Sequence, residues 1–316
     1  MNSPKSSRLP DEIRMSDQVR IVEVGPRDGL QNEKTPVSVA ARIAFIEALL
    51  GAGLRTIEVG AFVSPKAIPQ MANSDQVLRG IGHHRDREFH VLVPNEKGYD
   101  TAREAGAKVI AVFAAASERF SRANINCSVA ESIERFKPVI NRARADGIKV
   151  RGYVSCVLGC PYEGEVQPRA VVDVAEVLWN LGCYELSLGD TIGVGTPVKT
   201  RRLLRAVAGV VPMAKLAMHF HDTYGQSLAN LYAGLEEGAR VIDSAAGGLG
   251  GCPYAPGATG NVATEDVVYM LEGMGIATGV DMTRLVAATN GISSLIGRPP
   301  VSRVASAINA SKRAVK

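Results

Sequence analysis

The amino-acid sequence predicts an α/β protein, a (β/α)8 TIM barrel with extra helices at its C-terminal end. Eight short apolar segments rich in Val and Ile follow one another, and each is followed by a helical pattern or by a loop and a helix. The length of 316 residues suits one large barrel. The turn after the first strand, Gly25-Pro-Arg-Asp-Gly29, is no dinucleotide fingerprint, so a doubly wound open sheet is the weaker alternative.

Each expected strand is short and apolar, as strands buried on both faces are. The strands are expected at Val19–Val24, Thr56–Gly60, Glu88–Val93, Val109–Phe113, Val150–Cys156, Glu185–Leu188, Leu216–His221 and Val241–Ser244. The intervening helices are expected at Ser38–Ala52, Ser74–Ile81, Glu96–Ala105, Ala130–Asp146, Arg169–Leu181, Val198–Val210 and Gln226–Glu237. Ser38 is suited to cap the first helix, and Gly51 and Gly53 are suited to end it.

The chain is expected to hold one folded domain, because no internal repeat and no interdomain linker is visible. Residues 1–18 are polar and are interpreted as a disordered tail, and residues 19–300 as the barrel with its additional helices. A glycine-rich loop, Ala246–Asn261, follows the eighth strand, and two further helices are expected at Val262–Met274 and Met282–Ile296. Residues 301–316 are interpreted as a C-terminal tail or helix, with Arg303–Lys316 as the helical candidate.

The composition of the chain indicates which classes of partner to exclude and which cellular compartment to expect. The net charge of +4 is spread along the chain without a basic, aromatic-interleaved cluster, so a nucleic acid is not expected as a partner. No apolar stretch is long enough to span a bilayer, and the start has no signal-peptide pattern, so no membrane partner is expected. The five cysteines are odd in number and scattered, which favours a reducing, cytoplasmic location over a disulfide framework.

The most informative stretch is His219-Phe220-His221, at the end of the seventh expected strand. Side chains alternate along a strand, so the two imidazoles point the same way and Phe220 points the other. Active sites of this fold lie at the carboxyl ends of the strands. A pair of hydrogen-bonded structural histidines is the alternative, but this position favours a pair of metal ligands.

Two oxygen-bearing side chains are expected at the same mouth. Asp28 follows the first strand and Asn261 lies beyond the eighth. Together with His219 and His221 they supply two nitrogens and two oxygens, a set that suits Mg²⁺ or Mn²⁺ and lacks the thiolates of a structural zinc site.

Other polar residues at the strand ends are candidates for the chemistry. Arg27 is a fixed cation suited to an enolate oxygen, although a surface ion pair is its alternative role. Glu58, within the second strand, is costly to bury unpaired, so a pairing with Arg27 is expected. Asp190 follows the sixth strand and is a candidate base or orienting group. Gln31 lies just beyond Arg27 and is expected to bind substrate with it.

Cys252 lies in the glycine-rich loop after the eighth strand. A thiol on a loop that can change shape over a metal site is suited to act as acid, base or nucleophile. The alternative is a free cysteine that packs as a small apolar residue.

These residues fall in segments that resemble 3-hydroxy-3-methylglutaryl-CoA lyase, a family of metal-dependent TIM-barrel lyases, over about Val19 to Ser294. His219–Gln226 alone fits the wider group, which includes isopropylmalate and homocitrate synthases, whereas the Gly-Gly-Cys-Pro-Tyr-Ala loop around Cys252 points to the lyase. The other segments that carry the resemblance are Val22–Glu33, Phe62–Lys66, Arg151–Glu163 and Ser187–Pro197.

The resemblance implies cleavage of 3-hydroxy-3-methylglutaryl-CoA to acetyl-CoA and acetoacetate with a divalent metal. The implied metal ligands are Asp28, His219, His221 and Asn261; the implied catalytic residues are Arg27, Cys252, Asp190, Glu58 and His219, and the implied substrate-binding residues are Arg27 and Gln31. The resemblance also implies an acyl-CoA substrate, a homodimer and a place in leucine degradation and ketone-body formation.

The chain departs from the family pattern after Pro65-Lys66, where Ala67-Ile68 stands in place of the usual tryptophan, so its acyl preference is open. Two other enzymes remain alternatives: a lyase for another 3-hydroxyacyl-CoA, and a Claisen-type enzyme that condenses an acyl-CoA with a 2-oxo acid. A non-catalytic metal-binding or CoA-binding protein is the alternative from another class.

Overall fold

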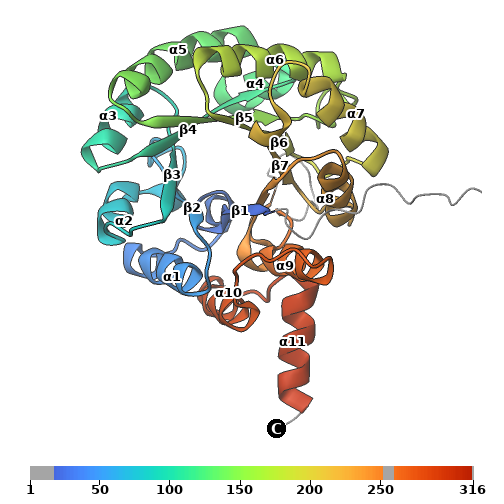
Figure 1. Ribbon diagram of the computed structural model, residues 1–316. Coiled ribbons are helices and arrows are strands. Elements are labelled where there is room, and N and C mark those ends of the chain that lie inside the picture. Colours follow the sequence, from blue (N-terminus) through green and yellow to red (C-terminus); the bar gives the residue numbers. More distant parts are fainter. Residues whose placement is uncertain (1–17, 252–259, 315–316) are drawn as a thin grey trace, which may run out of the picture.

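The computed structural model describes residues 18–251 and 260–314, which form a closed barrel of eight parallel strands (Figure 1). Each strand pairs with its neighbours in chain order, and β8 closes the barrel on β1. The strands are β1 Arg20–Glu23, β2 Thr56–Ala61, β3 Glu88–Leu92, β4 Val109–Ala115, β5 Lys149–Ser155, β6 Glu185–Asp190, β7 Leu216–Phe220 and β8 Val241–Ser244. The predicted TIM barrel is confirmed, and each strand agrees with its expected range to within about two residues at either end.

Helices ring the outside of the barrel (Figure 1). They are α1 Val39–Gly51, α2 Ser74–Gly80, α3 Glu96–Glu104, α4 Glu118–Ile125, α5 Val129–Ala145, α6 Pro168–Leu181, α7 Pro197–Val207 and α8 Ser227–Glu236. The cap expected of Ser38 is present, since its hydroxyl oxygen accepts a hydrogen bond from the Ala41 N–H at 3.2 Å. Short helical turns also occur at η1 Gly25–Gly29, η2 Pro69–Met71, η3 Met213–Lys215 and η4 Ala246–Gly248.

Helix α4 was not predicted from the sequence. It is only eight residues long and largely polar, and its start depends on Ser117, whose side chain accepts a hydrogen bond from the Phe120 N–H. A capping box formed by Ser128 and Glu131 then begins α5 directly afterwards. Two helices therefore stand where the sequence indicated one.

After β8 the chain continues into three further helices, α9 Thr264–Gly273, α10 Met282–Ile296 and α11 Arg303–Ala314. Helix α11 extends away from the barrel in Figure 1. The expected disordered tail, residues 1–18, lies outside the described residues except for its last member. Within the described part of the chain, no helix has the length and apolar character that crossing a membrane requires.

The interior of the barrel holds a chain of buried charges as well as apolar side chains. Arg151 on β5 binds Asp243 on β8 with a 2.7 Å contact between its Nη2 and Oδ1, and Glu185 on β6 with a 2.8 Å contact between its Nε and Oε1. Strands β5 and β8 are not neighbours, so the Arg151–Asp243 pair crosses the barrel interior. At the amino end of the barrel, Arg20 on β1 binds the second oxygen of Glu185.

Candidate active site

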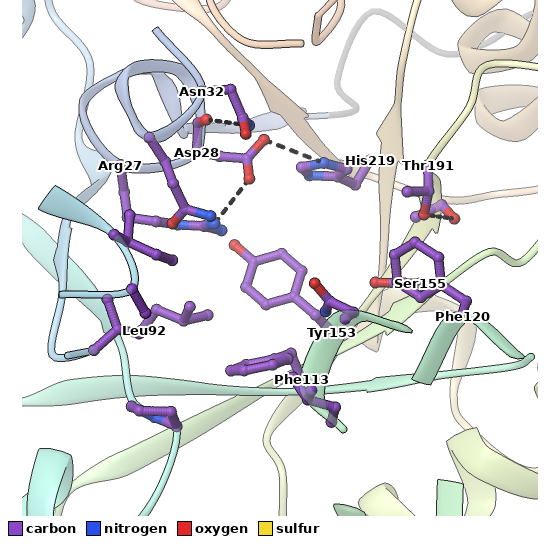
Figure 2. A pocket seen from close by; sticks show the side chains of 18 of the residues that line it. Arg27, Asp28, Asn32, Leu92, Phe113, Phe120, Tyr153, Ser155, Thr191 and His219 are labelled. Carbon is purple, nitrogen blue, oxygen red and sulfur yellow. Dashed lines mark hydrogen bonds and ion pairs between the residues drawn. The ribbon is translucent and has the colours of Figure 1, made fainter. Parts of the chain in front are cut away.

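A cavity of about 670 Å³ opens at the carboxyl ends of the strands, where this fold places its active sites. Its lining includes Arg27 and Asp28 after β1, Tyr153 on β5, and His219 and His221 at the end of β7. Residues far apart in the sequence are therefore collected at one mouth, as the barrel prediction requires. Figure 2 shows Arg27, Asp28, Tyr153 and His219 directed toward a common space.

A five-residue π-helical turn, η1, places Arg27 and Asp28 side by side at this mouth. The turn begins directly beyond β1 and is anchored there, since the Gly25 N–H donates to Glu23 Oε1 at 2.8 Å. Gly29 must lack a side chain, because a Cβ at this position would lie 2.7 Å from the Cβ of Leu249. The close packing of η1 against the segment after β8 therefore depends on glycine.

The guanidinium of Arg27 lies between two carboxylates. Its Nε is 2.6 Å from Glu58 Oε2 and its Nη1 is 2.8 Å from Asp28 Oδ1. Burial would lower the pKa of Arg27, but the charges of Glu58 and Asp28 outweigh burial and raise this pKa. The expected pairing of Glu58 with Arg27 is present, and it keeps a charged guanidinium 5.6 Å from the ring centre of Tyr153.

The two histidines and Asp28 form a compact cluster. One potential ligand atom from each of Asp28, His219 and His221 lies within 4.8 Å of the other two. An isolated antiparallel bridge between His221 and Asn261 brings Asn261 to the same place, where its Nδ2 donates to Asp28 Oδ2 at 2.8 Å. The four residues expected to hold a metal are thus brought together by the fold.

Two buried atoms of this cluster are free to coordinate a metal. Among the described residues, His221 Nδ1 and Asn261 Oδ1 have no hydrogen-bond partner. An unpartnered buried acceptor is costly, and a divalent cation coordinated by these side chains would remove that cost. Nitrogen and oxygen donors at this spacing fit a hard divalent cation.

The protonation states of Asp28 and His221 suit the same ion. Burial raises the pKa of Asp28, but the nearby Arg27, His219 and His221 outweigh burial and bring this pKa down to about 2. Burial and the neighbouring His219 lower the pKa of His221 to about 4. At neutral pH the cluster therefore offers a carboxylate and a neutral imidazole, the forms that bind metals.

Asp243 on β8 was not identified from the sequence, yet it orients His219. Its Oδ2 lies 3.2 Å from His219 Nδ1 and accepts a 2.8 Å hydrogen bond from the hydroxyl of Ser187, while Arg151 binds both carboxylate oxygens. With Nδ1 engaged, His219 presents Nε2 to Asp28, 3.8 Å from its Oδ2. An acidic residue within a short strand expected to be buried was the signal available in the sequence.

The carboxylate of Asp190 is not part of the cluster. Its neighbour Gly189 lines the cavity, and successive strand residues face opposite sides, so Asp190 points outward from the barrel. Its oxygens accept hydrogen bonds from the N–H groups of Val194 and Gly195, at 3.2 and 2.8 Å. Burial raises the pKa of Asp190 to about 6. Its observed contacts hold the turn that leads into α7.

Gln31 lines the cavity, and its side-chain oxygen has no partner among the described residues. This placement agrees with the expected contact to substrate. Cys252 lies outside the described residues, whereas Gly251, directly before it, lines the cavity.

A sequence profile of the HMGL-like family matches residues 18–292. The chain belongs to the HMGL-like family. Its relatives include the 3-hydroxy-3-isohexenylglutaryl-CoA/hydroxymethylglutaryl-CoA lyase of Pseudomonas aeruginosa, which is 58% identical over 296 residues, 94% of this chain and 99% of the relative.

Solved structures of the same family agree with the fold. A hydroxymethylglutaryl-CoA lyase from Pseudomonas aeruginosa has 59% identity and a TM-score of 0.92, covering 93% of this chain and 98% of that one. An HMG-CoA lyase from Acinetobacter baumannii, solved with coenzyme A and 3-methylmalate, has 39% identity and a TM-score of 0.89, covering 92% and 95%.

Proposed function

We propose that this protein cleaves 3-hydroxy-3-methylglutaryl-CoA to acetyl-CoA and acetoacetate with the aid of a divalent metal, Mg²⁺ or Mn²⁺. The observation that carries the proposal is the Asp28–His219–His221 cluster, with its ligand atoms within 4.8 Å of one another, beside the buried cation Arg27. The membership of the HMGL-like family and the names of the relatives support the same reaction.

The residues that would hold the metal are Asp28, His219, His221 and Asn261. A bound divalent cation would supply Lewis acidity toward the hydroxyl and carboxylate oxygens of the substrate. The Nε2 atom of His219 is the ring nitrogen available to it, because Asp243 engages Nδ1. We therefore assign this nitrogen to the metal.

Cleavage breaks the C2–C3 bond of the substrate. The hydroxyl proton leaves, C3 becomes the ketone carbon of acetoacetate, and the bonding electron pair moves to C2 as the enolate of acetyl-CoA. We assign Arg27 to hold the enolate oxygen, and the contacts of its guanidinium with Glu58 and Asp28 at the mouth of the barrel support this role. Protonation of C2 then gives acetyl-CoA, and the family resemblance supports the Cys252 thiol as the proton donor.

The test is release of acetoacetate from 3-hydroxy-3-methylglutaryl-CoA by purified protein, supplied with Mg²⁺ or Mn²⁺ and then treated with a chelator. Activity that disappears with the chelator and returns with metal is the expected result. Metal-replete protein that releases no acetoacetate would contradict the proposal for this substrate. A panel of other 3-hydroxyacyl-CoA thioesters and of acyl-CoA/2-oxo acid pairs would then decide between the two alternative enzymes.

We further propose a cytoplasmic homodimer that serves leucine degradation, with acetoacetate as its ketone-body product. Within the described residues, Cys127, Cys160 and Cys183 are free thiols, which fits a reducing compartment. The dimer rests on the family resemblance, and light scattering coupled to size-exclusion chromatography measures it directly.

A further inference from the structure

A second cavity, of about 570 Å³, opens at the amino ends of the strands, at the other end of the barrel from the candidate active site. A lysine or arginine begins, or directly precedes, seven of the eight strands. Parallel strands all begin at the same end of a barrel, so these cations gather around one mouth. Five of them line the cavity: Arg20, Arg55, Arg87, Lys149 and Lys215.

Carboxylates neutralise only part of this positive charge. The lining holds three of them, those of Asp86, Glu88 and Glu185. Glu88 Oε2 lies 2.7 Å from the Nζ of Lys149, and Glu185 binds Arg20. These two acids are already engaged with cations, so the lining as a whole keeps an excess of positive charge.

Three cations of the lining have no carboxylate partner in the part of the chain that the structure describes. The side chains of Arg55 and Lys215 are exposed and make no hydrogen bond or ion pair there, and the guanidinium of Arg87 donates only to the carbonyl oxygen of Asp86, at 3.3 Å. Arg87 precedes β3 and Lys215 precedes β7, and these strands lie four apart in a closed barrel of eight. The two cations therefore stand on opposite sides of the mouth.

This arrangement favours one kind of anion. A carboxylate accepts hydrogen bonds through two oxygens in one plane, whereas a phosphate group has three acceptor oxygens that point in different directions. Lysine and arginine both bind phosphate groups well. The cavity of about 570 Å³ falls within the range of small-molecule sites, about 300–1,000 Å³, and leaves room for more than one phosphate group.

We propose that the cavity lined by these five cations is a binding site for a small anion that carries two or more linked phosphate groups. One phosphate group binds Arg55 and Arg87, beside β2 and β3, and another binds Lys215, beside β7. The site is separate from the metal cluster, which lies at the carboxyl ends of the strands. Its occupancy is measured without turnover, so the result is independent of the proposed lyase function.

The test is isothermal titration calorimetry of the full-length protein with inorganic pyrophosphate, at a constant concentration of free Mg²⁺. Saturable binding of one anion per chain is the expected result. Citrate, which has a similar charge on carboxylates alone, should bind at least about tenfold more weakly. Pyrophosphate that shows no saturable binding at millimolar concentration, or citrate that binds as tightly, would overturn the proposal.

Variants locate the anion. Arg55→Gln and Lys215→Gln each remove an exposed cation and break no observed side-chain contact. Each should raise the dissociation constant for pyrophosphate about fivefold, and the double variant about twentyfold, because the two cations act from separate sides of the mouth.

Arg135→Gln is the matched control, since Arg135 is also an exposed arginine but lines the cavity at the carboxyl ends of the strands. Its dissociation constant for pyrophosphate should stay within about twofold of the wild-type value. If the double variant, with folding verified by circular dichroism, binds pyrophosphate like wild type, the proposed site is wrong. Weaker binding in Arg135→Gln alone would place the anion in the candidate active site instead.

Discussion

Replacing Asp243 with Asn tests whether Asp243 sets the tautomer of His219 that can bind a metal. A carboxamide has one acceptor oxygen, and the buried guanidinium of Arg151, which now binds both carboxylate oxygens, competes for it. The amide NH2 then faces Nδ1 of His219, which becomes the acceptor, and the imidazole proton moves to Nε2. A protonated Nε2 cannot bind a metal, so the substitution selects the wrong tautomer without removing the ring.

The expected loss follows from the contact itself. A hydrogen bond to a charged group at 3.2 Å is worth about 1.5–3 kcal/mol, which corresponds to a loss of about ten- to a hundredfold in affinity. The dissociation constant for Mn²⁺, measured by calorimetric titration of Asp243→Asn, should therefore rise by that factor. Activity should fall less when Mn²⁺ is raised to saturate the variant.

Ser187→Ala is the matched control. It removes the hydroxyl that donates to Asp243 Oδ2 at 2.8 Å but leaves the carboxylate and its bond to His219 in place. Its Mn²⁺ affinity should stay within about threefold of wild type. If folded Asp243→Asn binds Mn²⁺ within twofold of wild type, the proposed control of the tautomer is wrong.

Three further outcomes are expected. Arg27→Lys keeps a positive charge but loses the fork that joins Glu58 and Asp28, so kcat should fall by about a hundredfold or more, and a loss under tenfold would count against the enolate role. Cys252→Ala should lose most of the lyase rate while the Mn²⁺ affinity measured by calorimetry is retained; a fully active variant excludes the thiol as proton donor. Burial raises the pKa of Glu23 from 4.5 to about 7, so the folded state holds the extra proton between these values and stability falls as pH rises through them. In urea unfolding from pH 4.5 to 7, Glu23→Gln should gain about 3 kcal/mol relative to wild type, and a pH-independent difference would exclude this assignment.

The barrel and four clustered side chains could be predicted because both depend on simple periodicity. Alternation within the seventh strand placed His219 and His221 on one face, and the rule that strand ends meet at one mouth brought Asp28 and Asn261 to them. Asp190 shows the limit of that reasoning. If the alternation along a strand is displaced by one residue, a side chain expected inside the barrel points outward. The observed register of β6 shows that Gly189 faces the cavity, so Asp190 does not.

The contacts across the barrel could not be predicted either. Arg151 and Asp243 are 92 residues apart, and pairwise contacts through a barrel interior depend on strand tilt and stagger, which the order of the strands does not specify. Helix α4 was missed for a different reason, since eight largely polar residues contain too few apolar positions for a helical pattern to be recognised.

A series of ion pairs links the two ends of the barrel. From Arg20 at the amino end it passes through Glu185, Arg151 and Asp243 to His219 beside the metal ligands. Loss of Glu185 would leave Arg151 with Asp243 as its only partner in this series. The net charge near His219 would then change, and with it the pKa of the imidazole. We therefore expect a substitution at the amino face, the face usually associated with stability in this fold, to change the protonation of His219 as well.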